Sequence, residues 1–357
     1  MNRALVLGGG GARGSFQIGM LEGLIGNQGL DFQTVRGVSV GALNAAFLAQ
    51  APTAGNSQAN LAARLQELKT LWMTEIQGNG SVYKGRGGWP AVLLGADSLY
   101  SLGPLRALVG KHVSLDALRR SGRDFAVGTV SLVSGKYAEW MPQGNDDFIE
   151  KLIASASIPV VFPFVDFKQA KDMLVDGGAR NITPLSSAFK TRPDEVYVLL
   201  TSRMFRNGDR LRDSEVEEYD YAYWQDTWLG TKINAMDVLL RTVDILTDEV
   251  YLGDLRGAIR WNTIIEAARS VSSVSSSHGA LPELVTGAVE KLNNALAVVN
   301  RRHVPLYILA PRVWFDETAA MGKKNDSTQF DPKLIANAIQ HGKTIAADRK
   351  LWVWPPA

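Results

Sequence analysis

The sequence predicts an α/β protein with a mainly parallel central sheet, and two observations lead to this prediction. Short apolar runs at Arg3–Leu7 and Thr34–Val38 have the character of buried strands. Each is followed by a glycine-rich turn and then by a stretch in which apolar residues recur at helical spacing. This alternation of strand, turn and helix is typical of parallel sheets. The length of 357 residues suits one large domain or two modest ones.

The remaining elements follow from the same patterns. Helices are predicted at Ser15–Ile25, Val40–Gln50, Leu61–Ile76, Asp147–Ala156, Ile233–Tyr251 and Leu284–Val299. Further strands are predicted at Phe125–Val133, Tyr137–Met141, Met173–Val175, Glu195–Thr201 and Pro305–Ala310. The stretch 78–102 is rich in glycine but carries Trp89, Leu93 and Leu94, so it is a candidate lid or lipid-entry surface, with an ordinary packed loop as the alternative.

Composition excludes several classes of function. The 38 basic and 36 acidic residues nearly balance, which gives no indication of a nucleic-acid partner. There is no cysteine, so disulfides and thiolate chemistry are excluded, and the four histidines are scattered without metal-ligand spacing. The N-terminal apolar run is too short for a signal peptide, and no run is long enough to span a bilayer. We therefore expect a soluble cytoplasmic protein without metal or cofactor.

A candidate nucleophile lies in the sequence GVSVG, Gly37–Gly41. Ser39 stands between a predicted strand and a predicted helix, the setting that a nucleophilic serine on a sharp turn requires. Gly37 and Gly41 carry no Cβ that would block an approaching substrate. The helix that follows directs its N-terminal amides at the serine oxygen, where they favour negative charge. The alternative is a structural serine in a crowded turn.

The glycine-rich loop Gly8–Gly14 follows the first strand. The backbone N–H groups of Gly9, Gly10 and Gly11 are candidates for an oxyanion hole, and Arg13 would hold the loop or meet an anionic head group. The spacing GxGxxG also fits a dinucleotide-binding turn. That interpretation requires an acidic residue at the end of the second strand, and the nearest, Asp31, precedes this strand. The dinucleotide hypothesis therefore fails.

A nucleophilic serine needs a base. His278, His303 and His341 follow Ser39 in the chain, but none lies in a motif typical of a catalytic triad. Asp176 is the better candidate, because it ends a predicted strand and is followed by Gly177 and Gly178, which leave space beside the carboxyl. A buried carboxylate in contact with the hydroxyl can act alone. By itself, however, the sequence DGG is more typical of a plain turn.

Together these elements resemble the bacterial patatin-like phospholipases. The resemblance rests on GGGARG (Gly9–Gly14), GVSVG (Gly37–Gly41), ASASIPVVFP (Ala154–Pro163), DGG (Asp176–Gly178) and NITP (Asn181–Pro184), in the family's order. It is firm over residues 3–200 and extends to Pro311.

The resemblance implies a three-layer α/β/α catalytic domain over residues 1–315, with a mainly helical insertion at about 203–300 and a C-terminal helical tail, 316–357, packed on the body. It implies a serine hydrolase of phospholipids or lysophospholipids, with Ser39 as nucleophile, Asp176 as base and the Gly9–Gly11 amides in the oxyanion hole. It also implies no metal and only transient contact with a membrane surface. The alternative is a catalytically silent protein of the same fold that binds lipid or regulates a partner.

Overall fold

The computed structural model describes most of the chain. The described residues are 1–88, 90, 94–207, 210–212, 255–267, 303–315 and 327–355, with the single positions 238, 241, 242, 245, 250, 253, 287, 291 and 318. The predicted helices Ile233–Tyr251 and Leu284–Val299 fall largely outside these residues, as do Trp89 and Leu93 of the candidate lid. The division of the chain at residue 315 and the helical nature of the insertion stay predictions.

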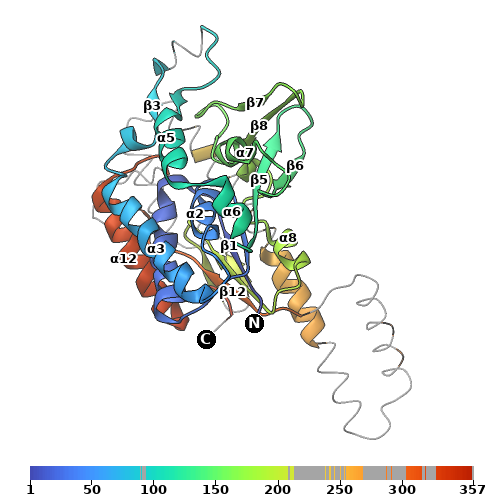
Figure 1. The fold of residues 1–357 in the computed structure, drawn as a ribbon. Helices are drawn as coiled ribbons and strands as arrows, with labels where there is room; N and C mark the ends of the chain where they lie inside the picture. Colours follow the sequence, from blue (N-terminus) through green and yellow to red (C-terminus); the bar gives the residue numbers. More distant parts are fainter. Residues whose placement is uncertain are drawn as a thin grey trace, which may run out of the picture.

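An eight-stranded sheet forms the centre of the molecule (Figure 1). Its strands are β1 (Arg3–Leu7), β2 (Thr34–Gly37), β5 (Asp124–Ser131), β6 (Tyr137–Trp140), β7 (Val165–Phe167), β8 (Asp172–Asp176), β9 (Glu195–Leu199) and β12 (Leu306–Leu309). The order is β12-β9-β1-β2-β5-β8-β7, and the first five of these are parallel. Strands β6 and β8 run antiparallel to β5, and β7 runs antiparallel to β8. The predicted fold class is confirmed.

The register of the parallel strands brings two predicted motifs to one edge of the sheet. Leu7 at the end of β1 pairs with Gly37 at the end of β2 and with Leu199 at the end of β9. The glycine-rich loop leaves β1 at this edge, and the Ser39 turn leaves β2 beside it. Loops at the carboxyl ends of parallel strands are where α/β proteins carry their ligand sites.

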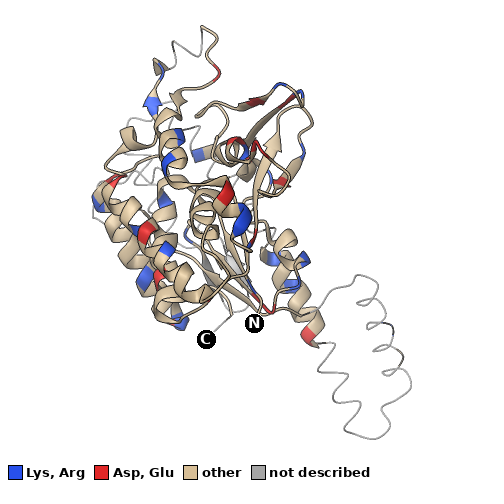
Figure 2. Cartoon of the chain, in the orientation of Figure 1, with Lys and Arg blue, Asp and Glu red and all other residues tan. Residues whose placement is uncertain are grey.

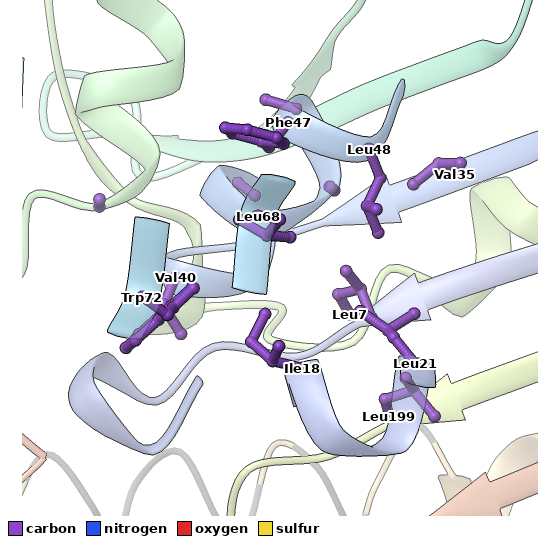
Figure 3. Close-up of a cluster of buried hydrophobic side chains, with 14 of the residues drawn as sticks. Leu7, Ile18, Leu21, Val35, Val40, Phe47, Leu48, Leu68, Trp72 and Leu199 are labelled. Atoms are coloured by element: carbon purple, nitrogen blue, oxygen red, sulfur yellow. The ribbon is translucent and has the colours of Figure 1, made fainter. Parts of the chain in front are cut away.

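One face of the sheet is covered by helices that share the larger core cluster. They include α1 (Ser15–Leu21), α2 (Val40–Ala49), α3 (Ser57–Thr74) and α12 (Pro332–Ala347), and α7 (Phe148–Ser155) packs on β5 from the same side. Because successive side chains of a strand point to opposite faces, Leu5 and Leu7 of β1 pack on this side, in the larger core cluster. Figure 3 shows part of the cluster, with Leu7 and Leu199 from the strands beside Leu21 of α1.

The other face of the sheet carries a smaller core. Ala4 and Val6, which alternate with Leu5 and Leu7 along β1, pack against α8 (Leu185–Lys190) and against a helix that covers residues 255–267. In Figure 1 these two helices lie together on the side of the molecule opposite α3 and α12. The sheet is therefore the middle layer of three.

Several elements differ from the prediction. The helix expected at Ser15–Ile25 ends at Leu21 and continues as a π-helical turn, Glu22–Asn27. The sequence analysis missed the edge strand β7 and three helices, α5 (Gly103–His112), α6 (Leu115–Arg120) and α8. The glycine-rich stretch contains a short hairpin of β3 (Lys84–Gly85) and β4 (Tyr100–Ser101). No described helix is both long and apolar enough to cross a bilayer.

Candidate active site

Ser39 lies on a sharp turn between β2 and α2. Its φ of 57° and ψ of −133° are unfavourable for a residue with a Cβ. Strand β2 ends at Gly37, and α2 begins at Val40, directly after the serine. The side chain therefore projects at the N-terminus of a helix, and the residue is only 6% exposed. This is the geometry of a nucleophile elbow.

Asp176 ends β8, where it pairs with Thr129 of β5. It is 5% exposed, and its Oδ1 accepts a hydrogen bond from the N–H of Gly178 at 2.7 Å. Oδ2 is buried and makes no hydrogen bond of regular geometry to a described residue. The Ser39 hydroxyl is nevertheless close enough to interact with this carboxyl. The structure thus brings together the two residues that the sequence analysis selected.

The environment of Asp176 suits a proton acceptor. Burial raises the pKa of its carboxyl to about 7, because the charged form loses its hydration. The nearby Ser39 hydroxyl and the hydrogen bond from the Gly178 N–H both lower the pKa and offset only part of this effect. A group with a pKa near neutrality can both take up and release a proton at physiological pH.

The glycine-rich loop lies directly beside Ser39. A Cβ on Gly9 would approach the Cβ of Ser39 to 2.9 Å, so only glycine allows this contact. The N–H groups of Gly10 and Gly11 make no hydrogen bond within the described part of the chain, whereas the next amide, of Ala12, donates to the carbonyl of Ser327 at 2.6 Å. Two donors therefore remain available beside the serine.

The other predicted supporting residues lie around this centre. Arg13 is buried, and its Nε donates to the carbonyl of Gly10 at 3.4 Å, within the loop itself. Gly41 occupies the first turn of α2. Gly177 and Gly178 form a 3-10 turn directly after Asp176.

An apolar cavity opens next to Ser39. Its lining includes Ser39, Val40, Leu43, Asn44 and Phe47, with Leu68 and Trp72 of α3, Leu105, Val109 and His112 of α5, and Phe330. Val40, Leu43, Asn44 and Phe47 recur at helical spacing along α2, so the cavity follows one face of this helix away from the serine. Val40, Phe47, Leu68 and Trp72 of this wall are visible in Figure 3.

The far end of the cavity is defined by the junction of α2 and α5. The Gln50 side chain, next to the last residue of α2, donates to the carbonyl of His112 at 3.1 Å. The His112 ring lies 6.0 Å from the ring of Phe47, and its Nε2 is 2.9 Å from a carboxylate oxygen of Glu75. His112 thus belongs to the end of the cavity away from the glycine-rich loop.

No histidine was selected as a base, and His112 and His341 have other contacts. His341 is buried, and its Nε2 accepts a hydrogen bond from the N–H of Arg312 at 3.1 Å. Burial lowers its pKa, and the nearby Arg312 adds to this effect, so the neutral ring is favoured. His278 lies outside the described residues. Among the described residues there is also no cluster of three or more side chains suited to a metal ion.

Sequence reasoning missed the residues that build the cavity and one that holds the serine turn. The spacing of Val40, Leu43, Asn44 and Phe47 was visible in the sequence and could have indicated the wall on α2. The contributions of α5 and Phe330 come from distant segments, and no local signal marks them. Ser155, whose hydroxyl accepts from the N–H of Ser39 at 3.1 Å, lies in a recognised motif, but no role was assigned to it.

The fold and the site define a class of protein: a three-layer α/β domain with a serine on a strained strand-to-helix turn, next to a buried carboxyl and a glycine-rich loop. The model of the patatin-like phospholipase family matches residues 5–189, just over half of the chain. The chain belongs to the patatin-like phospholipase family, a family of lipid hydrolases, and the resemblance seen in the sequence is confirmed.

Two solved structures are distantly similar to this chain. VipD from Legionella pneumophila is 11% identical with a TM-score of 0.37, and the match covers 97% of this chain and 66% of that one. A structure of SpcU in complex with ExoU from the type III secretion system of Pseudomonas aeruginosa gives 13% identity, a TM-score of 0.29 and coverage of 95% and 76%. The chain thus spans just under two thirds of the VipD chain. No curated protein matches the sequence.

Proposed function

We propose that this protein hydrolyses acyl esters of membrane-type lipids, with phospholipids or lysophospholipids as substrates. Ser39 is the nucleophile and Asp176 the base in this proposal. One observation carries it: a serine held in an unfavourable backbone conformation interacts with a buried carboxyl at the wall of an apolar cavity. Strained backbone conformations and buried titratable groups cluster at functional sites, because they lower the stability of the fold and persist where function requires them.

The first half of the reaction forms an acyl-enzyme. The Ser39 hydroxyl oxygen attacks the ester carbonyl carbon while its proton passes to the Asp176 carboxylate. The negative charge on the carbonyl oxygen is stabilised by the N–H groups of Gly10 and Gly11, which make no hydrogen bond to the described residues. The bond to the alcohol then breaks, and the alcohol oxygen takes the proton from Asp176.

The second half releases the fatty acid. A water molecule gives its proton to Asp176 and attacks the acyl carbonyl, so a second tetrahedral oxyanion forms at the same amides. The bond to Ser39 breaks, and Asp176 returns the proton to the serine oxygen. The raised pKa of Asp176 supports this double use, because the same group must accept and donate a proton in each half of the reaction.

The apolar lining of the cavity suits the acyl chain of the substrate. From Ser39 to Phe47 the wall on α2 is eight residues long, or about 12 Å at 1.5 Å per residue. An extended hydrocarbon advances about 1.3 Å per carbon, so this length corresponds to about nine carbons. Each buried methylene contributes about 0.8 kcal/mol, which favours medium and long chains over short ones.

Transient contact with a membrane surface is part of the proposal. Leu132 and Val133, at the tip of the β5–β6 hairpin, are 50% and 63% exposed, and the N–H of Leu132 bonds to the carbonyl of Met173, itself 38% exposed. Exposed basic residues border this apolar tip, namely Lys136, Lys168, Lys171 and Arg180. The exposed acidic residue Asp166 borders it as well. Figure 2 shows basic residues at the tips of the β5–β6 and β7–β8 hairpins. Apolar tips with cations around them fit an anionic bilayer.

The direct test is release of free fatty acid from phospholipid and lysophospholipid micelles. We expect turnover by the wild-type protein and at least a 1,000-fold loss in Ser39→Ala and in Asp176→Asn, both folded, since removing either group abolishes the proton-coupled attack. Turnover by either variant near the wild-type rate would remove that residue from the mechanism. No turnover by the wild-type protein, with lipid binding retained, would favour the silent lipid-binding alternative.

A further inference from the structure

The strongest unassigned feature is a hydroxyl beneath the serine turn. We propose that Ser155 is a positioning residue that holds the Ser39 turn at the correct distance from Asp176; this inference rests on the proposed function. Ser155 is the last residue of α7 (Phe148–Ser155) and is completely buried. Its hydroxyl accepts a hydrogen bond from the N–H of Ser39 at 3.1 Å and donates one to the carbonyl of Gly128 in β5 at 2.6 Å.

The second partner of Ser155 links it to the Asp176 turn. A Cβ on Gly177, the residue after Asp176, would lie 2.5 Å from the same Gly128 oxygen, so the Ser155 hydroxyl and the turn after Asp176 both contact one carbonyl group. The N–H of Asp176 donates to the carbonyl of Ser157 at 2.9 Å, two residues beyond Ser155. The C-terminal end of α7 therefore touches the backbone of both proposed catalytic residues.

These contacts have a physical consequence for Ser39. A residue with a Cβ pays about 1–3 kcal/mol for such a backbone conformation, and it persists only where neighbouring groups hold it. The Ser155 hydroxyl supplies the acceptor for the buried N–H of Ser39. Without the Ser155 hydroxyl, the Ser39 N–H and the Gly128 carbonyl both lose a buried hydrogen-bond partner. The turn can then move to a less strained conformation. A shift of about 1 Å at a reacting atom can cost about 100-fold in rate.

The test compares Ser155→Ala with a matched control. Ser121 has the same kind of environment: it is 2% exposed, its hydroxyl donates to the Leu118 carbonyl at 2.9 Å, and it accepts from the N–H of Arg123 at 3.1 Å. It lies at the end of α6, and it does not line the cavity. Ser121→Ala therefore removes an equivalent pair of hydrogen bonds without touching the Ser39 turn.

Hydrolysis of a soluble p-nitrophenyl ester provides the readout. We expect Ser155→Ala to lower kcat by about 10- to 100-fold with KM changed less than about twofold, while Ser121→Ala keeps the wild-type kcat. The thermal midpoints of the two variants should fall by similar amounts. We also expect the pH profile of Ser155→Ala to rise at a higher pH than that of the wild type, because a displaced Ser39 hydroxyl no longer lowers the pKa of Asp176.

Two further variants keep the inference falsifiable if Ser155→Ala fails to fold. Ser155→Thr retains the hydroxyl and should recover most of kcat, and Ser155→Cys, with a weaker hydrogen-bonding group of similar size, should give an intermediate value. Equal losses of kcat in Ser155→Ala and Ser121→Ala, or a Ser155→Ala kcat within twofold of wild type, would overturn the inference. A wild-type protein that hydrolyses no ester would instead overturn the proposed function, and the inference with it.

Discussion

The Ser39 hydroxyl interacts with the carboxyl of Asp176, a residue that comes from the antiparallel half of the same sheet. Ser39 follows the parallel strand β2, and Asp176 ends β8, with β5 between the two strands. The pair has the two chemical parts that acyl transfer needs, a hydroxyl and a proton acceptor. Burial supplies the basicity that a histidine provides in a triad.

The pH dependence of hydrolysis should report the state of Asp176. The carboxylate form is required to accept the serine proton, and burial raises its pKa to about 7. We expect kcat/KM on a soluble ester to rise with pH through about 7 and then to level off, with a value at pH 5 about 100-fold below the plateau. Circular dichroism at each pH controls for unfolding. A rate that is highest below pH 6 would contradict the assignment of the base.

The buried Asp176 carboxyl should lower the free energy of unfolding at neutral pH. In the unfolded chain an aspartate has a pKa of about 3.9, so between pH 4 and 7 the folded protein holds a proton that the unfolded chain releases. The free energy of unfolding therefore falls as pH rises across this window, by up to about 4 kcal/mol at 1.36 kcal/mol per pH unit.

The variant Asp176→Asn does not titrate and keeps an oxygen for the Gly178 N–H. We expect it to exceed wild type in the free energy of unfolding at pH 8, with a much smaller difference at pH 4, as measured by urea denaturation. This is the trade-off between stability and activity that buried catalytic groups impose. An equal difference at both pH values would show that Asp176 does not titrate in the expected window.

The length of the cavity should set acyl-chain preference. Val109 lines the cavity on α5, one turn before His112, so Val109→Phe shortens the space available to the distal carbons. Losing contact with two or three methylenes, at about 0.8 kcal/mol each, should lower kcat/KM for p-nitrophenyl laurate about 15- to 60-fold. Hydrolysis of p-nitrophenyl butyrate serves as the internal control. Equal losses on both esters would mean that the acyl chain does not occupy this cavity.

Membrane contact should depend on the tip of the β5–β6 hairpin. The double variant Leu132→Glu with Val133→Glu should lose co-sedimentation with phosphatidylcholine vesicles that contain phosphatidylglycerol, in a Ser39→Ala background that prevents hydrolysis. Met73→Glu is the matched control, because Met73 is also an exposed apolar residue (40%) but lies on α3. Binding that survives the double variant, or that is equally strong without phosphatidylglycerol, would assign the contact to another surface.

The sequence predicted the part of the fold that has strong local patterns. Strand β1 has the predicted bounds, and β2 and α2 differ from prediction only at their last residues, because apolar runs and flanking glycines define them. Helix α5 was missed, since Gly103 and Pro104 at its start are as typical of a loop as of a helix N-terminus. The edge strand β7 is only three residues long, too short to produce an alternating pattern.

The sequence pointed to the two central residues of the candidate site, but not to the cavity or to the part that Ser155 plays. Ser39 and Asp176 were selected from the sequence because glycines mark their turns. The cavity depends on tertiary packing of α2, α3 and α5 with Phe330, which lies far along the chain and stacks against Trp72 with ring centroids 6.4 Å apart. The part that Ser155 plays depends on its distance to the Ser39 amide, and only coordinates provide that distance.

The most direct measurement is the reaction of the folded protein with a fluorophosphonate, followed by intact mass and peptide mapping. A serine activated by its neighbour attacks this phosphorus centre, whereas an ordinary buried serine does not. We expect one adduct per chain, located on Ser39, that is absent in Ser39→Ala and formed at least 100-fold more slowly in Asp176→Asn. Labelling of another residue in the wild-type protein, or an unchanged rate in Asp176→Asn, would contradict this expectation.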